Sequence, residues 1–269
     1  MKRSQNFTDT KNKIVGIIPV RMKASRFPGK PLKKILNFTM LEHVYLRAKL
    51  FKPWTLLIVA TCDKEILNFC RDKKIPCLMT SNKHTRCLDR VHEAAKKINI
   101  NLKQNDIVVC VQGDEPLLTP KMIKKTIEAI FLKKNALSSV LAMDIISKKQ
   151  FNDKNIVKII HDLNGEVLYT SRAPVPYCEK FSRKIKAKRV GGIFAFRWEF
   201  LKKFNKTKES FLERVESCDS NRICDNGRGQ FIAQYPFNPF FSVDCPADLE
   251  TVIRYMKKDK IYKSYKNIK

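Results

Sequence analysis

Short apolar runs alternate with amphipathic segments through the first half of this chain, and that order constrains the fold most. The alternation predicts strands at 14–20, 56–61, 77–80 and 106–111, and helices at 41–51, 64–73, 88–98 and 120–134. Strands that alternate with helices are typical of a parallel sheet with helices on both faces. We therefore expect an α/β fold with a mostly parallel, doubly wound sheet. Ligands of such sheets bind beyond the carboxyl ends of the strands.

The second half of the chain is less regular. Two short apolar runs flank Asn164-Gly165, a dipeptide that favours a hairpin turn. The other elements expected there are a strand at 192–196, a mixed segment at 211–224 and a helix at 248–256. We interpret the chain as a loose polar tail over residues 1–13 and a single domain over 14–269, with a smaller lobe inserted at about 150–225. Such a lobe is a candidate cover for a ligand site and a candidate dimer contact.

The chain of 269 residues carries a formal net charge of +28. Clustered Lys and Arg would indicate nucleic-acid binding through the release of counterions. Here the basic residues run from Lys2 to Lys269 without one dominant block and without a recognition motif. We therefore favour solvated charges over a nucleic-acid partner, and we expect the positive field to attract anionic substrates.

Two further features bear on the compartment. No apolar run reaches the roughly 18 residues that a membrane helix needs, and the polar start lacks the apolar core of a secretory signal. The nine cysteines include no C-x-x-C pair and no Cys/His spacing typical of zinc. We expect no membrane partner, and reduced thiols in a cytoplasmic protein.

A basic loop follows the first predicted strand. It places Arg21, Arg26 and Lys30 around Gly29. Backbone N–H groups in a tight loop, together with fixed cations, suit a polyphosphate. The loop lacks the GKS or GKT of a Walker motif. The competing interpretation is a solvated basic loop in a lysine-rich protein.

Two aspartates follow apolar runs further along the chain. Asp114 comes just after Gly113, which follows the predicted strand at 106–111. Asp244 precedes a helix that begins near Pro246. An aspartate at a sheet edge can hold Mg²⁺ against nucleotide phosphates, because Mg²⁺ prefers one or two carboxylates plus phosphate oxygens. The alternatives are an ordinary Gly-Asp turn at the first position and a helix cap at the second. The basic loop nearby favours metal binding at Asp114.

These motifs resemble those of a known family. The loop matches the pattern P-A-R-x-x-S-x-R-x-P-G-K-P-L of nucleotidyltransferases that activate sugars, with Val20 in place of Ala. Further motifs are V-Q-G-D-E-P at 111–116, M-T-S at 79–81 followed by His84, Y-T-S-R-A-P-V-P at 169–176 and S-V-D-C-P-A-D-L-E at 242–250. Their order and spacing resemble the CMP-Kdo synthetases (3-deoxy-manno-octulosonate cytidylyltransferases) over nearly the whole chain after residue 13.

The resemblance implies an α/β fold of the nucleotide-diphospho-sugar transferase type, with CTP as donor, an acidic sugar as acceptor, Mg²⁺ and a homodimer. It implies that Arg21 and Lys30 bind the triphosphate, with Ser25 and Arg26 in support. It implies further that Asp114 and Asp244 bind Mg²⁺, that Thr80 and Ser81 contact the nucleotide, and that Gln112 and Arg172 face the sugar. Arg21, Lys30 and Asp114 are then the catalytic residues. The implied reaction is in-line attack of an anomeric hydroxyl on the α-phosphate of CTP, which releases pyrophosphate.

The chain departs from the family pattern at positions expected to contact the acceptor. The pattern H-x-S-G-T-[DE]-R reads His84-Thr85-Arg86-Cys87-Leu88-Asp89-Arg90, so Ser-Gly-Thr is replaced. Lost polar partners change specificity strongly. We therefore hypothesise an acidic acceptor other than ordinary Kdo, with Arg86 as a new contact to its acid group; the alternative is a surface arginine.

Two more polar residues are candidate sugar contacts. His84 is either structural or a substrate contact, and we assign it no catalytic role. Asp219 aligns with a position that is usually acidic in the family.

Three functions remain open from the sequence. The first is a CTP-dependent nucleotidyltransferase, which we prefer because the cations of the loop and both aspartates are intact. The second is a relative that binds CTP without turnover, which the changed acceptor region would allow. The third is a nucleic-acid-binding protein, for which only the net charge argues.

Overall fold

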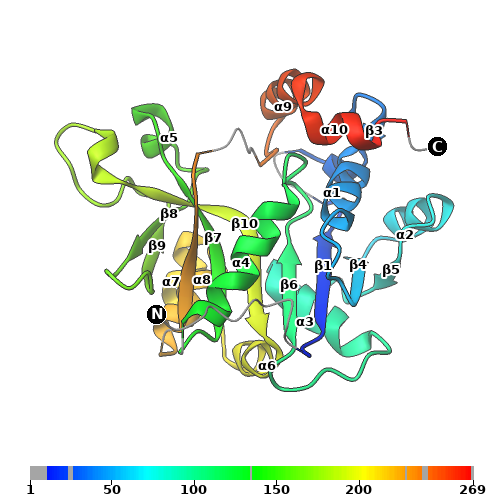
Figure 1. Cartoon of the computed structure of the whole chain (residues 1–269), viewed down its shortest axis with the longest axis horizontal. Coiled ribbons are helices and arrows are strands. Elements are labelled where there is room, and N and C mark those ends of the chain that lie inside the picture. The colour runs from blue at the N-terminus through cyan, green and yellow to red at the C-terminus, as the bar shows by residue number, and fades with distance from the viewer. Residues whose placement is uncertain (1–10, 24–26, 134, 228, 238–241, 268–269) are drawn as a thin grey trace. The chain divides into compact units, whose positions relative to one another are not determined.

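The computed structural model describes residues 11–23, 27–133, 135–227, 229–237 and 242–267 (Figure 1). The described chain forms two compact units. The first unit comprises residues 13–101, 108–123 and the C-terminal residues from 242, and the second comprises residues 102–107 and 124–237. The sequence analysis expects a single domain over residues 14–269 with a lobe inserted at about 150–225. This division stays a prediction.

The first unit is built on parallel strands. Its sheet has the order β6-β1-β4-β5, formed by β1 (Ile14–Val20), β4 (Leu56–Thr61), β5 (Cys77–Met79) and β6 (Ile107–Val111). Strand β1 pairs in parallel with β4, and β4 pairs in parallel with β5. The interior strands are almost wholly buried, which agrees with their unbroken apolar sequences.

Several α-helices lie within the first unit. They are α1 (Met40–Lys49), α2 (Lys64–Asp72), α3 (Cys87–Lys97), α9 (Pro246–Lys258) and α10 (Lys260–Tyr265). Helices α1, α2 and α3 contact β1, β4 and β5 (Figure 1). Three short elements complete the unit: η2 (Lys30–Leu32) and the two-stranded pair β2 (Lys34–Ile35) and β3 (Phe38–Thr39).

A buried arginine ties the C-terminal helices to the rest of the first unit. Arg47 on α1 is 1% exposed, and its Nη2 lies 2.8 Å from an Asp259 carboxylate oxygen between α9 and α10. Its Nε donates to the backbone oxygen of Leu118 at 2.6 Å. Because a buried charge is costly without partners, these contacts fix α9 and the segment after β6 on α1. They thereby hold the two stretches that carry the predicted metal ligands.

The second unit has a mixed sheet. Its strands are β7 (Ser138–Asp144), β8 (Lys158–His161), β9 (Val167–Ser171), β10 (Lys188–Arg197) and β11 (Gln230–Tyr235). Strand β11 pairs in parallel with β7, whereas the pairs β7–β10, β8–β10 and β8–β9 are antiparallel. The predicted hairpin at Asn164-Gly165 is confirmed as the turn between β8 and β9, where Gly165 has a φ of 85°.

The helices of the second unit include most of α4 (Pro120–Leu132), which begins in the first unit. The others are α5 (Lys148–Asn152), η3 (Arg183–Ile185), α6 (Trp198–Lys206), α7 (Phe211–Glu216) and α8 (Asp219–Asp225). A buried ion pair joins α7 to α8: Arg222 Nε lies 2.6 Å from Glu213 Oε2, and the two side chains are 4% and 0% exposed. The α/β prediction is confirmed in both units.

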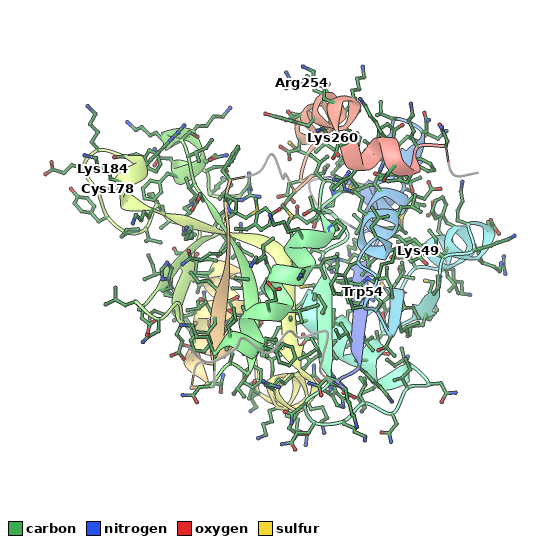
Figure 2. All side chains as sticks on the ribbon, viewed as in Figure 1. Lys49, Trp54, Cys178, Lys184, Arg254 and Lys260 are labelled. Atoms are coloured by element: carbon green, nitrogen blue, oxygen red, sulfur yellow. The ribbon has the colours of Figure 1, made fainter. Side chains whose placement is uncertain are left out.

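Charged side chains cover the faces of several elements. Lys49 on α1, Lys184 on η3, Arg254 on α9 and Lys260 on α10 are all exposed (Figure 2). Their separation along the chain agrees with solvated surface charge. Within the described residues, every helix is too short or too polar to cross a bilayer.

Candidate active site

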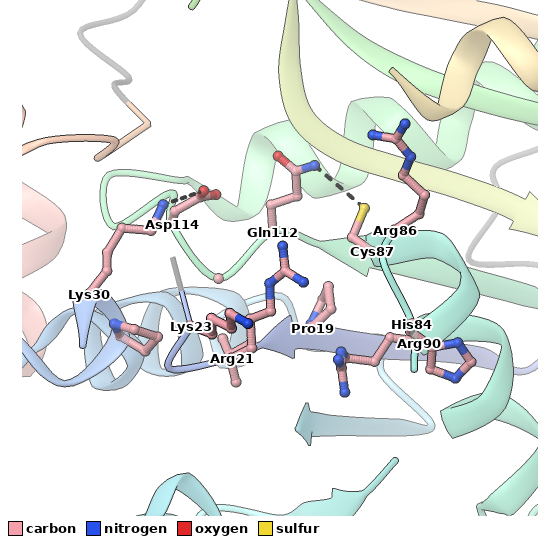
Figure 3. Close-up of a pocket in the computed structure, with 13 residues that line it drawn as sticks. Pro19, Arg21, Lys23, Lys30, His84, Arg86, Cys87, Arg90, Gln112 and Asp114 are labelled. Atoms are coloured by element: carbon pink, nitrogen blue, oxygen red, sulfur yellow. Dashed lines mark hydrogen bonds and ion pairs between the residues drawn. The ribbon is translucent and has the colours of Figure 1, made fainter. Parts of the chain in front are cut away.

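A pocket opens in the first unit where β1 and β6 end. Its cavity volume is about 200 Å³. The lining residues are Pro19, Val20, Arg21, Lys23, Lys30, Pro31, His84, Arg86, Cys87, Arg90, Gln112, Gly113 and Asp114 (Figure 3). Five of these are Arg or Lys and one is acidic, so the lining favours an anionic ligand.

Close packing at Gly113 shapes the floor of the pocket. A Cβ atom added there would lie 2.2 Å from Val20 Cγ1 and 3.0 Å from the backbone oxygen of Pro19. Only glycine therefore lets the segment after β6 approach the end of β1 this closely. This approach brings Asp114 next to the basic loop. Gly29, in that loop, has a φ of 71°, which also favours glycine.

Hydrogen bonds join the two segments that carry the aspartates. The backbone N–H of Val243 donates to the backbone oxygen of Asp114 at 3.0 Å, and the Ser242 hydroxyl donates to a Glu115 carboxylate oxygen at 2.5 Å. At the start of α9, Asp248 accepts hydrogen bonds from the backbone N–H groups of Asp244 and Cys245, both at 2.9 Å. Asp248 therefore caps the helix, and Asp244 is left to face the loop.

Lys30 lies between the two aspartates. Its Nζ is 2.8 Å from Asp114 Oδ2 and 3.6 Å from Asp244 Oδ1, and its side chain is 14% exposed. Burial by itself would lower the pKa of Lys30, but the charges of Asp114, Asp244 and Glu115 outweigh burial and raise this pKa. Lys30 is therefore a fixed positive charge at the pocket wall (Figure 3).

The aspartate pair suits Mg²⁺. Asp114 Oδ1 is buried and has no hydrogen-bond partner among the described residues. Buried carboxylate oxygens normally have a partner, and a cation would supply one here. Across the described ranges, no group of three or more His, Cys, Asp or Glu side chains could hold a metal. Two carboxylates agree with Mg²⁺, which takes its other ligands from phosphates and water.

The start of α3 and the turn before it form another wall of the pocket. Gln112 Nε2 donates to Cys87 Sγ at 3.7 Å (Figure 3). Arg90 is 3% exposed and contacts Cys62 Sγ through Nη2 at 3.4 Å, while its Nη1 donates to the Thr80 hydroxyl. Arg90 is thus held rigidly at the edge of the pocket.

Glu93 organises the turn before α3. Its carboxylate accepts hydrogen bonds from the backbone N–H of Ser81 at 2.9 Å and from His84, and it pairs with Lys97 at 2.6 Å. Burial by itself would raise the pKa of Glu93, but the hydrogen bonds of Lys97, Ser81 and His84 lower it to about 2. His84 lines the pocket and is bonded to Glu93, which is the structural contact considered for it from sequence; its contact with substrate stays a prediction.

The predicted site residues fall into four groups. Arg21, Lys30, His84, Arg86, Gln112 and Asp114 line the pocket, and Asp244 contacts the lining residue Lys30. Thr80 and Ser81 lie one layer behind the lining residues, bonded to Arg90 and Glu93. Arg172 and Asp219 belong to the second unit. Ser25 and Arg26 lie outside the described residues. The ligands expected for all of these residues stay predictions.

Arg172 is fixed within the second unit. Its Nε donates to the backbone oxygen of Glu216 at 2.8 Å, and its Nη1 donates to that of Lys154 at 3.0 Å. Glu216 also accepts hydrogen bonds from the hydroxyls of Tyr169 and Ser171, at 2.8 and 2.7 Å. The sequence prediction missed Glu216 as an organiser of the Y-T-S-R motif, because no pattern within that motif points to it.

Three polar lining residues were also missed: Lys23, Cys87 and Arg90. The signal for Arg90 was present, since it ends the H-x-S-G-T-[DE]-R pattern. Lys23 occupies a variable position of the loop pattern. Cys87 stands where the family pattern has glycine.

Comparisons with known proteins agree with this geometry. A family model described as "Cytidylyltransferase" matches residues 15–230. The chain belongs to the cytidylyltransferase family. A 3-deoxy-manno-octulosonate cytidylyltransferase of Syntrophobacter fumaroxidans is 36% identical over 93% of this chain and 99% of its own length. The Fusobacterium nucleatum protein of the same name is 33% identical over 93% of this chain and 99% of its own.

A solved structure is similar to this cytidylyltransferase as well. It is a CMP:2-keto-3-deoxy-manno-octonic acid synthetase complexed with CTP, with a TM-score of 0.82 and 29% sequence identity. The match covers 92% of this chain and 99% of that one. The family and the fold implied by the motifs are thus confirmed, and the cytidylyltransferase is a nucleotidyltransferase enzyme.

Proposed function

We propose that this cytidylyltransferase couples CTP to 3-deoxy-manno-octulosonate, or to a closely related acid, in a Mg²⁺-dependent reaction that gives the CMP-sugar and pyrophosphate. The proposal rests on one observation: in a chain from this family, five cations and Asp114 line one pocket, and Asp244 lies 3.6 Å from the lining residue Lys30. The names of the relatives and the CTP in the similar structure support the choice of substrates.

The basic loop would hold the triphosphate. Arg21 and Lys30 line the pocket within the loop, where their charges would neutralise the phosphate oxygens as the acceptor's anomeric hydroxyl attacks the α-phosphorus. Asp114 and Asp244 would hold Mg²⁺, which supplies further neutralisation of the phosphates when bound. The bond to the leaving pyrophosphate breaks as the new P–O bond forms, so no covalent intermediate with the protein is needed.

The acceptor would bind near the wall formed by the turn before α3. Arg86 lines this wall beside Cys87, where the family pattern has Ser and Gly. A guanidinium suits a carboxylate, so we propose that Arg86 contacts the acid group of the acceptor. Gln112, His84, Arg172 and Asp219 stay candidate acceptor contacts. The hypothesis of an acceptor other than ordinary Kdo then states that the enzyme turns over a related sugar acid faster than it turns over Kdo.

The test is a turnover assay with the full chain. It measures pyrophosphate and CMP-sugar from CTP, Mg²⁺ and a panel of sugar acids that includes 3-deoxy-manno-octulosonate. We expect product with CTP, little with ATP or UTP, and none when the metal is chelated. Rapid and selective use of 3-deoxy-manno-octulosonate would refute the altered specificity. Stabilisation by CTP without product from any acid would favour the relative that binds but does not turn over.

The state of the protein in the cell is also part of the proposal. All nine cysteines are free, which supports a reducing, cytoplasmic setting. The homodimer implied by the resemblance would cover apolar side chains such as Phe211 and Val215, which are 67% and 62% exposed. Light scattering at micromolar concentration tests this point: a mass near 31.3 kDa would mean a monomer.

A further inference from the structure

One ammonium group serves both aspartates at the pocket. Lys30 Nζ lies 2.8 Å from Asp114 Oδ2 and 3.6 Å from Asp244 Oδ1. A cation shared between two carboxylates is the arrangement that a bound metal ion would make. The lysine is mostly buried, since its side chain is 14% exposed.

The shared ammonium has a physical consequence for the carboxylates. Without a cation between them, two neighbouring carboxylates repel each other. Lys30 contacts both carboxylates and so holds them at one position. Hydrogen bonds from Val243 to Asp114 and from the Asp244 backbone to Asp248 hold the surrounding backbone in place. The aspartates are therefore preorganised before any ligand arrives.

The same ammonium opposes a metal ion at that position. A divalent cation held by Asp114 and Asp244 would lie within a few ångströms of Lys30 Nζ, which is 2.8 Å from Asp114 Oδ2, and two positive charges repel each other at such distances. Lys30 must therefore withdraw when the metal binds. It lies at the start of η2, directly after Gly29 in the basic loop. A withdrawn Lys30 stays within the loop that is expected to hold the triphosphate.

We propose that Lys30 acts as a placeholder for the metal ion: it holds Asp114 and Asp244 together in the free enzyme and moves to the triphosphate when metal and nucleotide bind together. This positioning role rests on the proposed function for the identity of the two ligands. It makes metal binding weak without nucleotide. Since binding couplings are reciprocal, it also links the affinity for metal to the affinity for CTP.

Binding of Mn²⁺ without nucleotide tests this role. The free Mn²⁺ signal in electron paramagnetic resonance gives the dissociation constant for the full chain and for its variants. We expect Lys30→Met and Lys30→Gln to bind Mn²⁺ at least about tenfold more tightly than the wild type, and Lys30→Arg to resemble the wild type. The matched control is Lys34→Met, because Lys34 is exposed on β2 and should leave the affinity unchanged.

A second variant locates the effect. Adding Asp114→Asn to Lys30→Met should remove the gain, because the gained site uses the Asp114 carboxylate. The proposal is wrong if folded Lys30→Met and Lys30→Gln proteins bind Mn²⁺ no more tightly than the wild type, or if the gain survives Asp114→Asn. Turnover is not part of this readout. A gain in Mn²⁺ affinity in a protein that makes no CMP-sugar would refute the proposed function alone, and turnover without the gain would refute the placeholder alone.

Discussion

Replacement of Gly113 by alanine should separate the two segments that build the pocket floor. The added Cβ would lie 2.2 Å from Val20 Cγ1, whereas an ordinary contact needs at least 3.4 Å, so the segments must move apart by about 1.2 Å. Overpacking of this kind costs about 1–3 kcal/mol of unfolding free energy. A misplacement of about 1 Å at a reacting centre can lower the rate about 100-fold. We expect both losses in Gly113→Ala.

Val20→Ala provides the matched test of this reasoning. It removes Val20 Cγ1, which leaves the Pro19 oxygen at 3.0 Å as the nearest atom to the new methyl group. The single Val20→Ala change should cost about 1–2 kcal/mol through lost apolar burial. In the double variant the two costs should not add, and kcat/KM should recover at least about tenfold over Gly113→Ala, because the main clash is gone.

The assays are pyrophosphate release and urea-induced unfolding. Wild-type activity and stability in Gly113→Ala would refute the argument from close approach. Strictly additive unfolding free energies in the double variant would show that the damage does not come from the contact with Val20.

Three further predictions concern other parts of the molecule. The pKa of Glu93 is lowered to about 2 from 4.5, so the contribution of its charge to stability is present above pH 4.5 and disappears as the pH falls toward 2. Glu93→Gln should therefore lower the urea midpoint of unfolding at pH 7. An equally large difference in urea midpoint between the wild type and Glu93→Gln at pH 3 would contradict this. Arg222→Met leaves the buried Glu213 charge without its partner and should cost about 3–5 kcal/mol by urea unfolding, so a loss under 1 kcal/mol would refute the importance of the pair. Arg86→Ser should raise the KM for the sugar acid about 10–100-fold, which corresponds to the loss of one charged hydrogen bond. The KM for CTP should stay unchanged. An equal effect of the control Lys83→Ser would count against a direct contact between Arg86 and the sugar acid.

The first half of the chain could be predicted closely from the sequence. Strand β1 and strand β4 have the predicted bounds, and helix α3 is displaced by one residue. Thr119 caps α4, because its hydroxyl accepts a hydrogen bond from the backbone N–H of Met122 at 3.3 Å. These predictions are right because the apolar periodicity and the end signals of each element indicate the same bounds.

The second half was predicted less well. Strand β7 was missed because its run Ser138–Asp144 begins with two serines, and only the short segment 133–137 separates it from α4. Strand β11 was missed because its run ends in Gln234 and Tyr235, although its first four residues are buried. Tertiary contacts fix both strands, since each pairs along its length with a neighbour in the sheet.

The motifs predicted which residues lie near the pocket, but not the contacts among these residues. The motif residues Arg21, Lys30 and Asp114 line one pocket, and their roles toward ligands stay predictions. Their relation to one another was not predictable, because the ion pair of Lys30 with both aspartates depends on contacts across 84 and more residues of sequence. The layer behind the pocket, in which Glu93 and Arg90 hold Thr80, Ser81 and His84, likewise forms only in the fold.

A crystal structure of the cytidylyltransferase with CTP and Mg²⁺ would test the central claim most directly. The account predicts Mg²⁺ at about 2.1 Å from carboxylate oxygens of Asp114 and Asp244, with Arg21 on the triphosphate. It also predicts that Lys30 Nζ will have left Asp114 for a phosphate oxygen. A triphosphate bound away from the basic loop, with Lys30 still paired to Asp114, would contradict it.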